Sequence, residues 1–159
     1  MPVPSQILSR SGLLALAPCG RILFIGHQVT PLLKRYFPPR PHSRRLPEPL
    51  ARWVASRDPS PLCWEKEGRR LIVSLRDRSV KDARCYLVRE AGAELSSFTP
   101  RELSILYWLT MGKTSAEIGL ILGLATNTIK KHLTTIFGKQ GVDHRFAAAL
   151  YAREFFPEG

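Results

Sequence analysis

The sequence predicts an α+β protein made of two small domains, residues 1–92 and residues 93–159. The chain has 159 residues, 44% of them apolar, which suffices for one ordinary domain or for two small ones with modest cores. In the first part, several short apolar runs alternate with period two or lie between turn signals, as strands do. In the second part, apolar residues recur at helical spacing, so we expect four helices and no sheet there.

The first domain is expected to open with a β-hairpin. Apolar runs at 13–17 and 21–25 are separated by Pro18-Cys19-Gly20, a strong turn signal. A helix should follow over residues 27–37, where apolar residues recur at helical spacing until Pro38-Pro39 ends the segment.

A loop, a short helix and three strands complete this domain. The Pro- and Arg-rich stretch 40–45 has no apolar periodicity and is expected to be a loop, and 46–55 should form a short helix with Pro47 near its first turn. The period then changes to two, which predicts antiparallel strands at residues 62–64, 70–75 and 85–88, joined through 66–68 and 76–82.

Two strands, two helices and three strands in this order resemble a PAS-like sensor domain. The resemblance implies a domain that senses a signal or pairs subunits, with a cup between helices and sheet. A small-molecule ligand is one candidate occupant of that cup, and the preferred alternative is that the apolar side chains themselves fill it. His27 and His42 lie in a helix end and a loop, where histidines are usually solvated, so we assign them no haem or metal role.

Capping and turn signals mark the helices of the second domain. Thr99, Pro100 and Glu102 predict an N-cap, a first helical residue and a capping box. Thr114 and Glu117 repeat the capping-box spacing, and a left-handed residue is expected at the glycine that follows Leu122. A short helix, a tight turn and a longer helix over residues 115–139 have the layout of a helix-turn-helix.

The longer helix, residues 126–139, carries three lysines and no acid. At about 100° per residue, its apolar side chains share one face, and the opposite face is formed by Asn127, Lys131, Thr134 and Thr135, with Lys130 on the flank. Lysine, threonine and asparagine reach base edges in the major groove, and ammonium groups attract phosphates. The alternative is an ordinary surface helix, which also carries lysines on its solvated side.

An alanine-rich helix is expected over residues 144–155, after a break at Gly141-Val142-Asp143. One of its faces holds Phe146, Ala149 and Leu150, and the other holds Ala148, Tyr151, Ala152 and Phe155. A helix that is apolar nearly all round is normally buried on both sides. We therefore predict that this helix meets its symmetry mate in a homodimer.

Three stretches resemble, in one register, the DNA-binding domain of LuxR-type (GerE-like) transcriptional regulators. They are FTPRE at 98–102, residues 112–142, and HRFAAAL at 144–150. The resemblance covers about a third of the chain, residues 98–152. It implies contacts to bases from one group of side chains and to phosphates from another. The implied DNA-binding set is Lys130, Lys131 and Thr134 at the bases, Thr126, Asn127 and Thr128 near the phosphates, and Lys139 as a further phosphate contact.

Three positions depart from the family pattern. Ala125 replaces the serine that usually caps the recognition helix, at a cost of about 1 kcal/mol unless the helix start shifts to let Thr126 take over. Gly119 stands where alanine is usual, which we expect to allow a close approach of the two helices. Gln140 replaces a core leucine. These departures bear on stability, since none removes a DNA-facing residue.

The formal net charge of +11 favours a polyanionic partner, but it is unevenly distributed. Residues 1–94 hold 17 basic and 8 acidic side chains, giving +9, whereas residues 95–159 hold 7 and 5, giving +2. The arginines of the first part are interpreted as a solvated surface, with nonspecific phosphate contacts as the alternative. A recognition helix in a domain of charge +2 should bind DNA weakly alone, which is a second reason to expect a dimer on an inverted repeat.

Other classes of protein find little support in the sequence. Cys19, Cys63 and Cys85 are too scattered for a disulfide framework or a zinc site and are expected to be reduced structural thiols. No run approaches the roughly 18 to 20 apolar residues of a membrane span, and the apolar run near the start is too short for a signal peptide, so we expect a cytoplasmic protein. Neither a Gly-rich phosphate loop nor a nucleophile elbow is found, which argues against an enzyme, and no cofactor or metal is expected.

The sequence therefore predicts a DNA-binding transcription regulator that acts as a homodimer, with RNA polymerase as a further candidate partner. The alternative function is a protein-interaction adaptor, in which the helix-turn-helix docks a partner protein. An adaptor has no need of a basic, acid-free face, so Lys130, Lys131 and Thr134 favour DNA.

Overall fold

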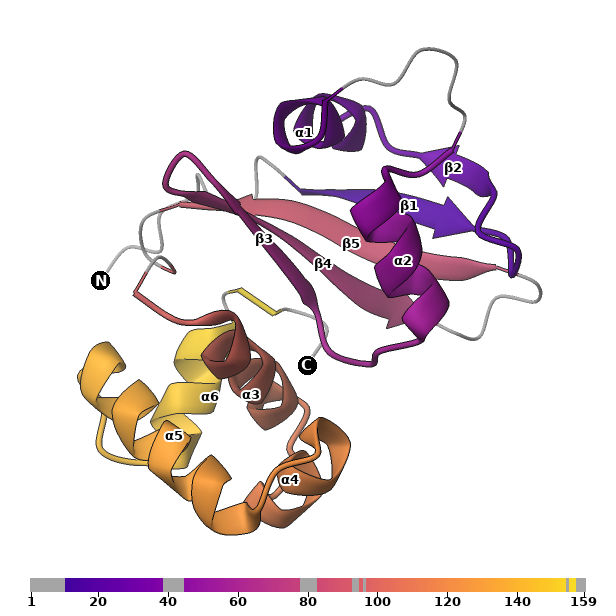
Figure 1. The fold of residues 1–159 in the computed structure, drawn as a ribbon. Coiled ribbons are helices and arrows are strands. Elements are labelled where there is room, and N and C mark those ends of the chain that lie inside the picture. The colour runs from indigo at the N-terminus through magenta and orange to yellow at the C-terminus, as the bar shows by residue number, and fades with distance from the viewer. Residues whose placement is uncertain are drawn as a thin grey trace. The chain divides into compact units, whose positions relative to one another are not determined.

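The computed structural model describes residues 11–38, 45–77, 83–92, 95, 97–153 and 155–156. The chain divides into two units, Met1–Glu94 and Leu95–Gly159. Each unit has its own secondary structure, a sheet with helices in the first and helices in the second, and they are drawn together in Figure 1.

The first unit contains a five-stranded antiparallel sheet in the order β2-β1-β5-β4-β3. Its strands are β1 (Ser11–Leu16), β2 (Ile22–Ile25), β3 (Leu62–Lys66), β4 (Arg69–Asp77) and β5 (Arg84–Ala91). The predicted hairpin and the three later strands are confirmed, and each of the later strands is longer than predicted. They run on because cross-strand pairing continues through charged residues, such as Arg69 opposite Lys66 and Glu90 opposite Leu71.

Two helices, α1 (Val29–Tyr36) and α2 (Glu48–Ser56), pack on one face of this sheet. The shared core takes alternate residues from the strands, including Leu14, Leu71 and Val88, each fully buried. Leu32 and Leu50 supply the helical side of the same core. Apolar side chains thus fill the space between the helices and the sheet. The predicted loop at 40–45, except Arg45, and most of the polar run 76–82 lie outside the described residues, as does His42.

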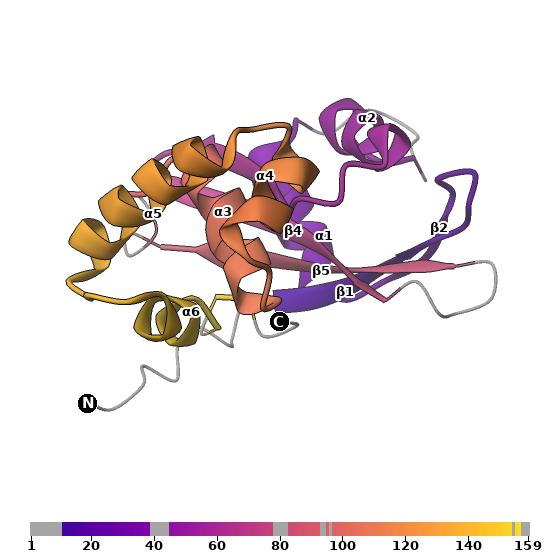
Figure 2. The ribbon, with the colours of Figure 1, turned by 90° about the horizontal axis from the view of Figure 1, so that it is seen from below.

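The second unit consists of α3 (Pro100–Thr110), α4 (Ser115–Leu122), α5 (Thr126–Gln140) and α6 (Arg145–Arg153). Both predicted capping boxes are confirmed, at Thr99 with Glu102 and at Thr114 with Glu117. Gly123 ends α4 in the left-handed conformation, with φ 66°. Figure 2 shows the ribbon from a second direction, with α4 and α5 joined by the tight turn. The predicted α+β class, with a helix-turn-helix in a four-helix second unit, is confirmed.

The turn between α4 and α5 explains Gly119. A Cβ atom at this position would lie 2.6 Å from the Leu124 carbonyl oxygen, closer than real Cβ contacts. The Leu124 amide also donates to the Gly119 carbonyl at 2.8 Å, so the turn folds back directly onto this residue. The close approach predicted for Gly119 is therefore present, but the neighbour is the backbone of the turn rather than the second helix.

The other two departures from the family pattern have different outcomes. Ala125 is the N-cap of α5 and provides no side-chain hydrogen bond, so the helix start has not shifted to Thr126. At the other end of α5, both amide atoms of Gln140 are buried and make no hydrogen bond within the described residues. Gln140 is half-buried as a residue, but its amide atoms are buried without a hydrogen bond to the described residues, which lowers stability.

The last helix, α6, buries only one of its two apolar faces. Ala148 and Ala152 are fully buried within the unit, and Phe155, just after the helix, is 4% exposed. Phe146 and Leu150 are 72% and 57% exposed. Across the described residues, no helix has the length and apolar character needed to cross a membrane.

Candidate nucleic-acid interface

The exposed face of α5 brings together most of the predicted DNA-binding side chains. Ile129, Leu133 and Ile136 are buried, which fixes the rotation of the helix on its unit. On the opposite side, Lys130 and Lys131 are exposed, together with the other members Asn127 and Thr134. Thr126 and Thr128 are half-buried at the start of the helix. Six of the seven predicted residues therefore lie on or beside one surface.

This surface is positively charged and rich in hydrogen-bond donors. Its two ammonium groups each carry three donors, and the helix contributes no acid from Thr126 to Gln140. The Thr134 hydroxyl donates to the Lys130 carbonyl at 3.1 Å, so its oxygen is left as an acceptor and its methyl group as an apolar contact. Such a surface is able to satisfy base edges as well as phosphates.

The N-terminal end of α5 offers a second kind of contact. Ala125 gives no side-chain cap, so the first-turn amides of the helix receive no acceptor from the N-cap side chain, and the Thr128 amide donates to the Ala125 carbonyl at 2.9 Å. Helix N-termini favour anions because unpaired amides and the helix dipole point outward there. Thr126, Asn127 and Thr128 surround this end, so their predicted position near phosphates agrees with the local electrostatics.

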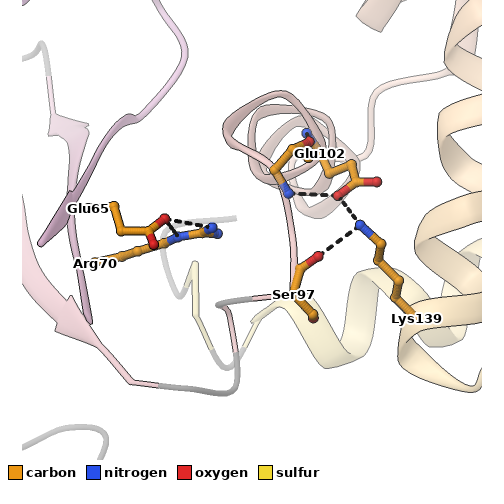
Figure 3. A network of polar contacts seen from close by, with 6 residues as sticks. Glu65, Arg70, Ser97, Glu102 and Lys139 are labelled. Atoms are coloured by element: carbon orange, nitrogen blue, oxygen red, sulfur yellow. Dashed lines mark hydrogen bonds and ion pairs between the residues drawn. The ribbon is translucent and has the colours of Figure 1, made fainter. Parts of the chain in front are cut away.

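Lys139 does not join this surface. Its ammonium group lies 2.7 Å from Oε2 of Glu102 and donates to the Ser97 carbonyl at 2.8 Å, as Figure 3 shows. It also lies 5.8 Å from the centre of the Phe98 ring, within reach of a cation–π interaction. These contacts connect the last turn of α5 to the start of α3. The phosphate contact of Lys139 stays a prediction, and its charge is already paired within the unit.

Glu102 is the centre of that network. The carboxylate is nearly buried and accepts from the Thr99 amide at 2.7 Å in addition to Lys139. Burial by itself would raise the pKa of this carboxyl, but the hydrogen bonds from Lys139 and Thr99 outweigh it and hold the pKa below its ordinary value. The carboxylate therefore stays ionised at neutral pH. Sequence analysis found Glu102 only as a capping residue, because its partner is 37 positions away in the chain.

Another local contact that sequence analysis missed is at the start of α6. Nδ1 of His144 accepts a hydrogen bond from the Ala147 amide at 3.1 Å, so this imidazole caps the helix. Arg145, one of the positions that match the family pattern, donates from Nη2 to the Lys113 carbonyl at 2.6 Å. These two contacts fix the direction in which α6 leaves the turn.

The structure gives no sign of a metal or thiol site in the parts of the chain that it describes. Within those ranges, no group of three or more His, Cys, Asp or Glu side chains is placed to hold a metal ion. The three cysteines are free thiols. Burial raises the pKa of the Cys63 thiol to about 12, which disfavours the reactive thiolate. His27 is exposed.

Comparison with known proteins shows what the second unit is similar to. Residues 96–152 match the family described as bacterial regulatory proteins, luxR family. The chain is 51% identical over 49 residues to the transcriptional activator protein EchR of Dickeya chrysanthemi, covering 31% of this chain and 20% of EchR. It is 46% identical over 56 residues to the transcriptional regulatory protein LiaR of Bacillus subtilis, covering 35% of this chain and 26% of LiaR.

Among solved structures, VqmA bound to DPO is similar over 91% of this chain and 82% of VqmA, with 14% identity and a TM-score of 0.43. That likeness is too slight to assign a ligand. The chain spans about a fifth of the length of EchR, so the shared part is the helix-turn-helix unit alone. The match and the four-helix fold cover the same residues, so this unit is similar to the luxR family of bacterial regulatory proteins.

Proposed function

We propose that this protein is a sequence-specific DNA-binding transcription regulator whose helix α5 enters the major groove. The observation that carries the proposal is the exposed, acid-free face of α5, with Lys130, Lys131 and Thr134 on it. Similarity to EchR and LiaR supports the same function, since both are named as transcription regulators. The function of an adaptor is less well supported, because a protein partner gives no reason for this charge pattern.

Within the groove, each predicted side chain has a separate role. Lys130 and Lys131 donate to acceptors on base edges, and guanine is the base that offers two such acceptors in the major groove. Thr134 offers an acceptor oxygen and a methyl group, which suits an amino group or a thymine methyl. Thr126, Asn127 and Thr128 hold phosphates at the N-terminal end of the helix, where the dipole assists them.

The protein acts as a homodimer through α6 in this proposal. Phe146 and Leu150 form an apolar surface that the unit itself leaves uncovered. A two-fold axis at this surface would present two copies of α5, and such dimers bind half-sites about one helical turn apart, roughly 34 Å. Two tethered contacts also compensate for the low charge of a single unit.

The first unit is proposed to sense a signal or to pair subunits, and a small-molecule ligand is compatible with that role. RNA polymerase is a proposed partner at the promoter, and the cytoplasm is the proposed location. These assignments follow from the proposed regulator function, and they depend on it.

Selection of duplexes from a random DNA pool, followed by titration at several salt concentrations, tests the proposal. Affinity for the selected duplex should fall linearly with salt on logarithmic axes, because lysine contacts release counterions from phosphates. The double variant Lys130→Gln/Lys131→Gln should lose the selected site, and Lys34→Gln, an exposed lysine in the first unit, is the matched control. A flat salt response, or no duplex retained at low salt, would rule out the proposal.

A further inference from the structure

A buried carboxylate in the first unit holds two arginines in place. Glu90 on β5 is 3% exposed at its side chain and accepts hydrogen bonds from Nη1 of Arg35 at 2.8 and 3.0 Å. Nη1 of Arg69 donates to the same carboxylate at 3.2 Å, and the Tyr36 hydroxyl donates to it at 3.1 Å. Burial and the neighbouring Glu90 raise the pKa of that hydroxyl, so it remains a donor. The two guanidinium groups are thereby fixed side by side.

A pocket of about 270 Å³ opens beside these arginines, lined by Arg35, Lys66, Glu67 and Arg69. The end of α1 and the turn between β3 and β4 form it, and Lys66 ties them together by donating to the Arg35 carbonyl at 2.6 Å. Figure 1 shows α1 and this turn within the first unit. This volume is enough for a compact polar group.

The donors at this pocket exceed what Glu90 requires. The described bonds from Arg35 and Arg69 to Glu90 use Nη1 alone, although a guanidinium group carries five N–H donors. Both side chains are about half exposed, at 49% and 48%. N–H groups that these bonds do not use thus remain on two partly exposed side chains, and the ammonium group of Lys66 lines the same pocket. Arg35, Lys66 and Arg69 are positively charged, and Glu67 and Glu90 are negatively charged. The site therefore keeps a net positive charge.

Glu67 lines the pocket, and its carboxylate opposes the binding of an anion there. It occupies the left-handed conformation with φ 53°, uncommon for a residue other than glycine, asparagine or aspartate, and Gly68 follows with φ 70°. This tight turn places a carboxylate at the rim of a basic pocket. Removing the Glu67 charge should strengthen anion binding, whereas removing the charge of Lys66 or Arg69 should weaken it.

We propose that this pocket binds the phosphate group of a small molecule. Arginine forks that are already oriented bind tetrahedral oxyanions through paired hydrogen bonds, and orientation by Glu90 lowers the entropy lost on binding. Donors from three side chains match the three free oxygens of a phosphate monoester better than the two of a carboxylate. The lining is polar and charged, so an apolar ligand gains little there. The site is separate from α5 and does not depend on the proposed binding of DNA.

The test is an NMR titration of the full chain that follows the guanidinium Nε–H resonances of Arg35 and Arg69. Inorganic phosphate and glycerol phosphate are the probes, and sodium chloride keeps the ionic strength constant. We expect saturable shifts with both probes and none with chloride alone. Shifts that grow linearly without saturation, or that chloride reproduces, would show only general charge screening and would overturn the proposal.

Variants locate the site. Lys66→Gln and Arg69→Gln should each weaken phosphate binding about tenfold, as the loss of one charge-assisted contact would. Arg69→Lys should recover part of the loss because it restores the charge without the fork. Glu67→Gln should tighten binding several-fold, which a purely structural role for the pocket does not predict.

Two control variants test whether cationic side chains outside the pocket contribute to phosphate binding. Lys34→Gln removes an exposed charge from α1 next to Arg35 but outside the pocket, and Lys130→Gln/Lys131→Gln removes charge from α5. Both should bind phosphate as the unmodified protein does. Equal weakening by Lys34→Gln, or no tightening by Glu67→Gln in a folded protein, would contradict the proposal.

Discussion

The ammonium group of Lys139 lies 2.7 Å from the carboxylate of Glu102 and joins the end of the recognition helix to the beginning of its unit. The same ammonium group also donates to the Ser97 carbonyl, so two of its three N–H donors are already used. One donor is left for solvent or for a phosphate. The Glu102 side chain of this pair is nearly buried. Loss of the pair should therefore mainly lower the stability of the folded protein.

The acid limb of the stability curve tests this pair. The pKa of Glu102 is lowered in the folded protein, so its contribution is present above the ordinary pKa of about 4.3 and is lost as the pH falls through the folded value. Glu102→Gln should lower the free energy of unfolding at pH 7 by about 1–3 kcal/mol and flatten the acid limb. Denaturant unfolding between pH 7 and pH 3 measures both. Glu117→Gln, in the exposed capping box of α4, is the control and should have the smaller effect.

Lys139→Ala distinguishes the two roles of this lysine. We expect it to lower the free energy of unfolding by about 1–3 kcal/mol, because a buried carboxylate loses its partner. A lysine that mainly contacts phosphate would instead leave stability unchanged and weaken binding to all duplexes alike. Unfolding and DNA titration on the same preparation separate these outcomes.

Lys131→Ala should weaken binding to a selected duplex by about 1–3 kcal/mol if its side chain contacts a base edge. The loss on a scrambled duplex of the same length should be smaller, since only phosphate attraction is removed there. Fluorescence titration with both duplexes provides the comparison. Equal losses on the two duplexes would remove Lys131 from the base-reading set.

The second unit was predictable in detail because its signals are local. Thr99 with Glu102, and Thr114 with Glu117, are capping boxes that act within one turn, and Gly123 ends α4 as expected. The pairing of Glu102 with Lys139 has no such signal, since nothing in a helical pattern indicates which distant lysine returns to a cap. The same holds for Glu90, an acid in a strand, whose buried position depends on arginines from α1 and β4.

The order of elements in the first unit was predictable, but the extent of the strands was not. Period two predicted β5 only from Cys85 to Val88, because the next residues are Arg89 and Glu90. Pairing with β4 carries the strand through both charged residues to Ala91, and the charge of Glu90 is compensated by Arg35 and Arg69. Tertiary contacts therefore decided what the sequence pattern left unassigned.

Gln140→Leu should stabilise the protein. The two buried amide atoms of Gln140 lack hydrogen bonds in the described structure, and an apolar side chain of similar size removes that penalty. We expect the free energy of unfolding to rise by about 1–2 kcal/mol, measured by denaturant unfolding. Gln140→Glu, which would bury a charge at the same place, should lower it. A loss of stability in Gln140→Leu would show that the amide has a partner.

The last prediction concerns the dimer proposed at α6. Phe146 and Leu150 are 72% and 57% exposed, whereas Ala148 and Ala152 are fully buried, so only the first pair is free to meet a second copy. Phe146→Glu and Leu150→Glu should keep the circular dichroism spectrum of the folded protein, because neither side chain supports its own unit. Both should shift sedimentation from dimer to monomer and weaken binding to an inverted repeat while leaving binding to one half-site unchanged. Leu120→Glu is the matched control, because Leu120 is an equally apolar residue, 84% exposed, on a different helix, α4. If both α6 variants remained folded and bound the inverted repeat as tightly as Leu120→Glu, then α6 would not be the dimer contact.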